Sequence, residues 1–180
     1  MLLKILDRFR KVPEGHKLFR GHYHDGEAVY TYLPNPDNEK HIIDGYFKVK
    51  YKYGRHKFAE AKGTYVNDIK QGHWEFVRDG FSTCRSLSAD FIDGQIVGSV
   101  VCMLSEKGIG YVRVSKLSFT VKDGNIVVPV TGVVRNVVVP ENYEANPQMV
   151  NLLNYVLSDC IPVLLSLAPR GHVSQYISIK

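Results

Sequence analysis

The chain has 180 residues, of which 44% are hydrophobic and 23% are charged, and its formal net charge at pH 7 is +5. This length and composition are typical of one globular domain with a core of its own. The three cysteines, Cys84, Cys102 and Cys160, are far apart and odd in number, which argues against a disulfide scaffold and favours a reducing compartment.

No apolar run reaches the roughly 18 residues that a membrane-spanning helix needs. The first 11 residues also lack the continuous apolar stretch of a signal peptide. We therefore expect a cytoplasmic protein, although a signal peptide that has already been removed is left open. The mildly basic balance permits contact with acidic lipid, nucleic acid or protein and singles out none of them.

The N-terminal segment, residues 1–15, has an amphipathic pattern. Leu2, Ile5, Leu6 and Phe9 fall at helical spacing among charged residues, and Pro13 then breaks the pattern. This spacing predicts a short helix over residues 2–11. Such a helix would cap one end of a β-sheet, or it would serve as a basic membrane anchor.

The middle segment, residues 16–140, has the alternation of β-strands. Phe47, Val49 and Tyr51 alternate with lysines, so one face of that strand is apolar and the other is charged. Turn pairs separate such runs and favour tight hairpins, which predicts an antiparallel meander. The pairs are Asp25-Gly26, Asp44-Gly45, Asn67-Asp68, Asp79-Gly80, Asp93-Gly94 and Asp123-Gly124. The valine-rich stretch 126–139 predicts strands covered on both faces, and residues 34–40 form an irregular loop.

The C-terminal segment, residues 141–180, predicts a helical cap that packs on the sheet. Asn146 can cap a helix and Pro147 suits its first turn. An apolar stripe follows over residues 147–160, and Pro162 is expected to interrupt it before a second apolar segment at 163–165. The alternating residues 173–179 predict one more strand.

Two stretches of the β-segment repeat each other at an offset of 26 residues. Tyr65 and Phe91 each stand two positions before a turn pair, and Gly72 and Gly98 each stand seven positions after the aromatic residue. A period between 20 and 50 residues is typical of arrays of one supersecondary unit. We therefore expect stacked β-hairpins, with Gly72 and Gly98 at equivalent positions.

This repeat resembles the MORN-type repeat, and is closest to a bacterial, antitoxin-like variant of it. The resemblance rests on Gly63, Tyr65, Asn67, Lys70, Gly72 and Trp74 in the first unit, and on Phe91, Asp93, Gly94 and Gly98 in the second, where Val100 replaces the tryptophan. It implies a mostly β fold, an elongated sheet of tandem hairpins with aromatic residues stacked on one face. It also implies a non-catalytic module for protein–protein interaction or scaffolding, whose partner is another protein.

Catalytic and metal-binding patterns are weak in this sequence, and we expect no cofactor, no metal and no catalytic residue. His22 and His24 could share a metal ion with His16 or Asp25, but exposed strand histidines explain them better. None of the cysteines has a local nucleophile signature, and a serine hydrolase elbow is missing from the sequence. An enzyme or an antitoxin-like regulator with an unrecognised site is kept as an alternative.

The best candidate binding surface in the sequence is a basic ladder on one strand. It consists of Tyr46, Lys48, Lys50, Lys52, His56 and Lys57. Lysines at alternate positions share one face, where they could hold anionic lipid headgroups together with the N-terminal helix. Lysines on a solvent-facing strand also keep a sheet soluble, which is the simpler explanation. A protein partner is favoured, an anionic membrane surface is the alternative, and nucleic acid is disfavoured.

Overall fold

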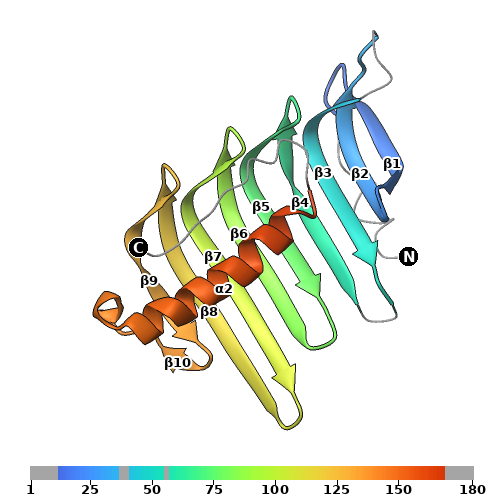
Figure 1. Cartoon of the computed structure of the whole chain (residues 1–180). Helices are drawn as coiled ribbons and strands as arrows, with labels where there is room; N and C mark the ends of the chain where they lie inside the picture. Colours follow the sequence, from blue (N-terminus) through green and yellow to red (C-terminus); the bar gives the residue numbers. More distant parts are fainter. Residues whose placement is uncertain (1–11, 37–40, 55–56, 169–180) are drawn as a thin grey trace.

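A computed structural model describes residues 12–36, 41–54 and 57–168, and within them the chain forms one antiparallel sheet with a C-terminal helix (Figure 1). Each strand pairs with the next along the chain, so the predicted meander is confirmed. The predicted N-terminal helix and the predicted strand at 173–179 lie outside the described residues. The strands are β1 (Lys17–Tyr23), β2 (Gly26–Leu33), β3 (Ile42–Lys52), β4 (Phe58–Val66), β5 (Ile69–Asp79), β6 (Thr83–Ile92), β7 (Gln95–Gly108), β8 (Tyr111–Lys122), β9 (Asn125–Val134) and β10 (Val137–Val138).

Three of the predicted turn pairs close two-residue hairpins. Asn67–Asp68, Asp93–Gly94 and Asp123–Gly124 all have positive φ at both positions, which Asn, Asp and Gly tolerate best. The first hairpin is turned by His24–Asp25, one residue earlier than predicted, because Tyr23 pairs with Gly26. The prediction of a turn at Asp44–Gly45 is wrong. Both residues lie inside β3, where Gly45 has a φ of 89° beside a β-bulge.

The two repeat glycines occupy equivalent positions, as predicted. Gly72 and Gly98 have φ values of 65° and 67°. Each lies beside a shift in strand register, between β4 and β5 in one unit and between β6 and β7 in the next. A bulge with left-handed backbone bends the strand and strengthens its twist. The 26-residue repeat is therefore a repeat of hairpin plus bulge.

The aromatic residues of the repeat pack together on one buried face. Tyr65, Trp74, Phe76 and Phe91 are all at most 2% exposed. The Trp74 ring meets Tyr65 edge-on at 4.9 Å and stacks on Phe76 at 5.5 Å between ring centroids. The predicted stacking is confirmed. Gly63 makes it geometrically feasible, because a Cβ atom there would lie 2.1 Å from the Trp74 ring.

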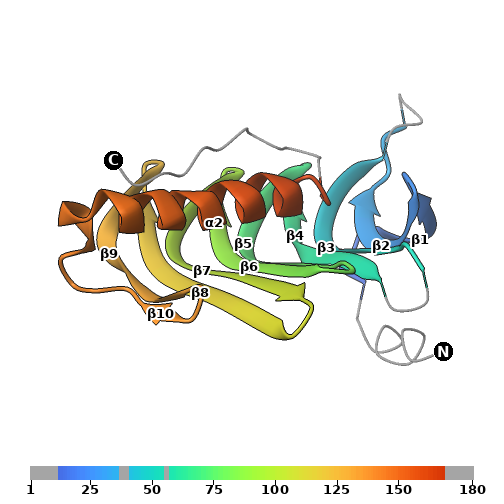
Figure 2. The same cartoon turned by 60° about the horizontal axis from the view of Figure 1, so that its bottom comes forward.

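The helix α2 (Pro147–Leu165) follows a short 3-10 helix η2 (Tyr143–Ala145) and runs across the same buried face (Figure 2). It contacts β5, β6, β7 and β9. The Asn146 side chain caps it by accepting from the amides of Gln148 and Met149, as the sequence predicts. Two hydrogen bonds of 2.7 and 3.1 Å from Arg85 to Asp159 fasten the helix to β6.

Two predictions about this part of the chain are wrong. Pro162 does not end the helix, which continues to Leu165. Pro162 is exposed, so the carbonyl that loses its helical partner can be hydrated. The valine-rich strands are covered on one face only, because Val130 and Val134 are buried while Val127, Val137 and Val138 are exposed.

By length and composition, α2 would also be able to cross a membrane. Its apolar residues instead face the sheet, which is the arrangement of a core helix. The buried members are Met149, Leu153, Val156, Leu157, Cys160, Ile161, Leu164 and Leu165.

Candidate interaction surface

The predicted lysine ladder lies on the sheet face opposite α2, which we call the open face. Lys48 and Lys50 point away from the buried Phe47 and Val49, as the alternation predicts. Their charges are largely taken up by neighbours, since Lys48 lies 3.2 Å from a carboxylate oxygen of Glu60. The Lys50 ammonium lies 4.7 Å from the centroid of the Phe58 ring. Much of this ladder therefore belongs to cross-strand pairs within the sheet.

The rest of the predicted surface divides between two places. Tyr46 lines a shallow depression of about 270 Å³ on the open face, together with Lys62, Gly63, Thr64, His73 and Glu75. Lys62 and Glu75 pair there at 2.7 Å. Lys52 is instead the last residue of β3, and Lys57 directly precedes β4 at the same end of the sheet. His56 lies outside the described residues. The structure thus does not bring the five described members of the predicted surface into one site.

The open face also brings together three side chains that the sequence did not connect. Ser88 Oγ lies 3.1 Å from His73 Nε2, and His73 Nδ1 lies 2.8 Å from Asp90 Oδ1. A serine, histidine and carboxylate in this order can activate a nucleophile. Here the His73 and Asp90 side chains are half exposed. The three residues stand in paired strands, whose backbone amides are engaged by the neighbouring strands rather than aimed at a substrate.

The histidines near the first hairpin do not form a metal centre. His24 is a turn residue with a φ of 51°, and its ring packs edge-on against Tyr23. His16 is bound to Asp44 at 2.6 Å, a contact that raises the pKa of the imidazole. Among the residues that the structure describes, no group of three or more His, Cys, Asp or Glu side chains could hold a metal ion.

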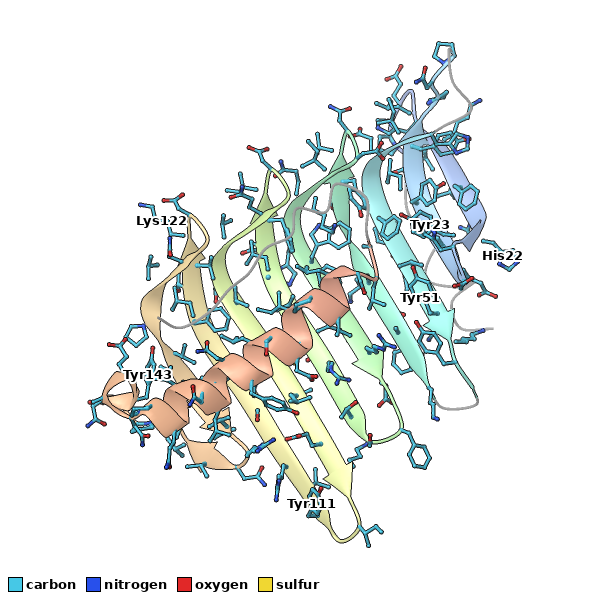
Figure 3. The ribbon with its side chains drawn as sticks, in the orientation of Figure 1. His22, Tyr23, Tyr51, Tyr111, Lys122 and Tyr143 are labelled. Atoms are coloured by element: carbon cyan, nitrogen blue, oxygen red, sulfur yellow. The ribbon has the colours of Figure 1, made fainter. Side chains whose placement is uncertain are left out.

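The two most exposed apolar side chains, Phe81 and Ile109, lie at one end of the strands, which we call the lower rim. It comprises the ends of hairpins β3–β4, β5–β6 and β7–β8, at the bottom of Figure 1. Phe81 is 86% exposed and Ile109 is fully exposed, and both stand in turns. Tyr53, Tyr111 and Val112 are about half exposed behind them. Figure 3 shows Tyr111 at this rim and Lys122 at the opposite one.

A cation accompanies each aromatic side chain of the lower rim. The Lys57 ammonium lies 4.7 Å from the Phe81 ring, the Arg113 guanidinium 4.9 Å from Tyr111, and the Arg78 guanidinium 5.6 Å from Tyr53. Such contacts are favourable and keep the charge at the surface. Lys57 and Lys107 also line a depression of about 430 Å³ between the tips, with Tyr53, Gly54, Asp79, Gly80 and Phe81.

The sequence analysis did not predict this rim, although two apolar residues in glycine-containing turns indicate it. Phe81 follows the turn pair Asp79-Gly80, and Ile109 stands between Gly108 and Gly110. A large apolar residue inside a tight turn cannot join the alternation of the flanking strands. It therefore projects beyond the sheet.

Comparisons with known proteins give no match: no family model, no curated protein and no solved structure matches this chain. The functional argument thus rests on the surface itself.

Proposed function

We propose that this protein is a non-catalytic interaction module, as the MORN-type resemblance implies, and that the lower rim is its docking surface. The single observation that carries the proposal is the high exposure of Phe81 and Ile109 at the tips of two hairpins. Burying an apolar side chain of this size is worth about 1.5–3 kcal/mol. Two such side chains at neighbouring hairpin tips can therefore supply much of the free energy of docking.

The composition of the rim supports the same proposal. Aromatic residues and arginine are enriched where proteins contact partners, and the rim combines both. The open face offers less, because its charges pair within the sheet: Lys48 with Glu60, and Lys62 with Glu75. Its Ser88, His73 and Asp90 side chains face bulk water, which weakens the electrostatic stabilisation that catalysis needs.

The proposal is tested by the size of the assembly that the protein forms in an extract of its native host. Wild type should elute with a partner, while Phe81→Ser combined with Ile109→Ser should elute as the free chain. Ile92→Ser is the matched control, because Ile92 is exposed at the opposite rim. Elution of the double variant with the partner, unchanged from wild type, would show that the rim is not the docking surface.

A further inference from the structure

We propose that the lower rim of one copy docks on the opposite rim of a second copy, so that the protein assembles head to tail. This inference rests on the proposed function and names the partner of its docking surface. The opposite rim, which we call the upper rim, consists of the β4–β5, β6–β7 and β8–β9 turns at the top of Figure 1. The two rims are complementary in the order of their tips, in their apolar side chains and in their charge.

The order of the strands places the tips of one rim opposite the gaps of the other. The β5–β6 tip lies between the β4–β5 and β6–β7 turns, and the β7–β8 tip lies between the β6–β7 and β8–β9 turns. On both rims neighbouring tips are two strands apart, which is about 10 Å. A second copy displaced along the strand direction can therefore seat these lower tips between upper turns.

Both rims expose apolar side chains at the places that would meet. Phe81 is 86% exposed at the β5–β6 tip. The upper turns on either side of this position expose Val66 and Ile69 by 46% and 40%, and Ile92 by 58%. In the displaced arrangement Phe81 lies among these three side chains, and Ile109 approaches Ile92 from the other side. Such a contact removes apolar surface of both copies from water.

The two rims carry charge of opposite sign. The described residues of the lower rim are mainly basic, namely Lys52, Lys57, Arg78, Lys107 and Arg113 against Asp79 and Glu106. Glu106 already pairs with Arg135 at 3.2 Å. The upper turns are mainly acidic, namely Asp68, Asp93 and Asp123 against Lys122. Head-to-tail docking brings opposite charges together, whereas two identical rims would place like charges against each other.

The charges also lie beside the apolar contacts. The Lys57 ammonium lies 4.7 Å from the centroid of the Phe81 ring. It therefore accompanies this ring into the gap between Asp68 and Asp93. The Asp68 carboxylate is already held in place, because it accepts a hydrogen bond of 2.8 Å from the Ile43 amide. A side chain that is fixed before docking loses little freedom when it meets a cation.

A contact between two different rims does not close on itself. Each copy that docks through its lower rim still offers its upper rim to a further copy. Such heterologous contacts produce open chains, or rings where the rotation closes, rather than symmetric dimers. The size of the assembly should therefore rise with protein concentration and fall as salt screens the charges. In this arrangement neither α2 nor the open face takes part in the contact.

The first test is analytical ultracentrifugation of the purified full chain over a range of protein and salt concentrations. We expect wild type to form species larger than a dimer, which dissociate as salt is raised. Phe81→Ser with Ile109→Ser should weaken association by about tenfold or more. Val138→Ser is the matched control, because Val138 is exposed on the edge strand β10. Circular dichroism of each variant checks that the fold is kept.

The decisive test mixes two variants that each keep one rim. The lower rim is disabled by Phe81→Ser with Ile109→Ser. The upper rim is disabled by Ile92→Ser with Asp93→Asn and Asp123→Asn, in which asparagine keeps the positive φ of both turns. Each variant alone should be monomeric, because it lacks one half of the contact. Their mixture should form a one-to-one dimer, since the first variant keeps the upper rim and the second keeps the lower rim.

A wild-type chain that stays monomeric at every concentration, or a mixture that forms no dimer, overturns the inference. The Ile92→Ser variant separates this result from the proposed function. A different partner that contacts the lower rim alone would leave assembly of Ile92→Ser in the host extract unchanged, whereas a second copy would not. If assembly in the extract requires Phe81 and Ile109 while the purified chain is monomeric, the docking surface stands with another partner. If neither assay depends on them, both proposals are wrong.

Discussion

Aromatic side chains occur in two contrasting settings in this protein. On the sheet face that α2 covers, which we call the covered face, Tyr65, Trp74 and Phe91 are buried and packed together. At the lower rim, Phe81 and Tyr111 project into solvent and carry cations over their rings. The first group contributes to folding, since its apolar area is removed from water. The second contributes almost nothing to folding and is available for a partner. We therefore expect substitutions of the buried aromatic residues to change stability, and substitutions at the lower rim to change docking alone.

The largest expected effect is at the centre of the covered face. Trp74→Ala should lower the free energy of unfolding by about 3–5 kcal/mol, because it removes a fully buried ring and leaves a cavity. The indole also donates to the Thr64 carbonyl at 3.0 Å, which would lose its partner. Chemical denaturation measures the loss. A change below about 1 kcal/mol would contradict the packing described for this face.

The next effect concerns a lysine within the same buried layer. Lys70 is 1% exposed, and 26 residues later its place is taken by the buried Ile96. Burial lowers the pKa of Lys70 to about 8. Its ammonium lies 5.5 and 5.6 Å from the Tyr65 and Trp74 rings, which offsets part of the cost. We expect Lys70→Ile to stabilise the fold at pH 7 by about 1–3 kcal/mol.

The pH dependence of stability gives an independent test of this lysine. Below pH 8 the amine is protonated in both the folded and the unfolded state, so the full cost of burial is present. Between pH 8 and 10.5 the unfolded chain holds more protons, so stability rises with pH, and the rise ends above 10.5. Lys70→Ile should remove this rise. The difference in free energy of unfolding between wild type and Lys70→Ile should therefore be smaller at pH 10 than at pH 7. The same difference at both pH values would contradict the assignment.

An effect of similar size and opposite sign is expected at the repeat glycines, which shape the covered face without packing in it. A Cβ atom at Gly98 would meet nothing within 4 Å, but the φ of 67° is unfavourable for other residues. Gly98→Val and Gly72→Val should each cost about 1–3 kcal/mol through backbone strain. Gly98→Asn is the matched control, since Asn tolerates this conformation and should cost less. Unchanged thermal midpoints for both valine variants would show that the stability of the fold does not depend on glycine at these bulges.

Much of the fold could be predicted because its signals are local. Asn67–Asp68 and Asp93–Gly94 close hairpins since the positive φ angles of a tight turn suit these residue types. The same reasoning wrongly predicted a turn at Asp44–Gly45, because a β-bulge also favours glycine at positive φ. Pro162 was misjudged for a different reason. Whether proline ends a helix depends on which side of the helix faces water.

The candidate site was harder to predict, since it depends on register and on position in space. His73 meets Asp90 and Ser88 only because β5 and β6 pair as they do. The lysines of β3 form the expected row, yet Glu60 on the next strand neutralises part of it. Phe81 looks like any core aromatic in the sequence. Only its place in a turn separates it from Phe76 and Phe91.

The smallest effect on stability is expected at the lower rim, where the contrast is sharpest. Phe81→Ser and Ile109→Ser should each change the free energy of unfolding by less than about 0.5 kcal/mol, because surface substitutions away from packed or strained sites rarely do more. Phe81 is 86% exposed, and its ring contact with Lys57 is also in water, where such contacts are worth little. Denaturation midpoints measured for Phe81→Ser and Trp74→Ala side by side give the comparison within one protein. A loss at Phe81 approaching that at Trp74 would mean that the rim belongs to the folding core, and its exposure would then give no reason to assign it to a partner.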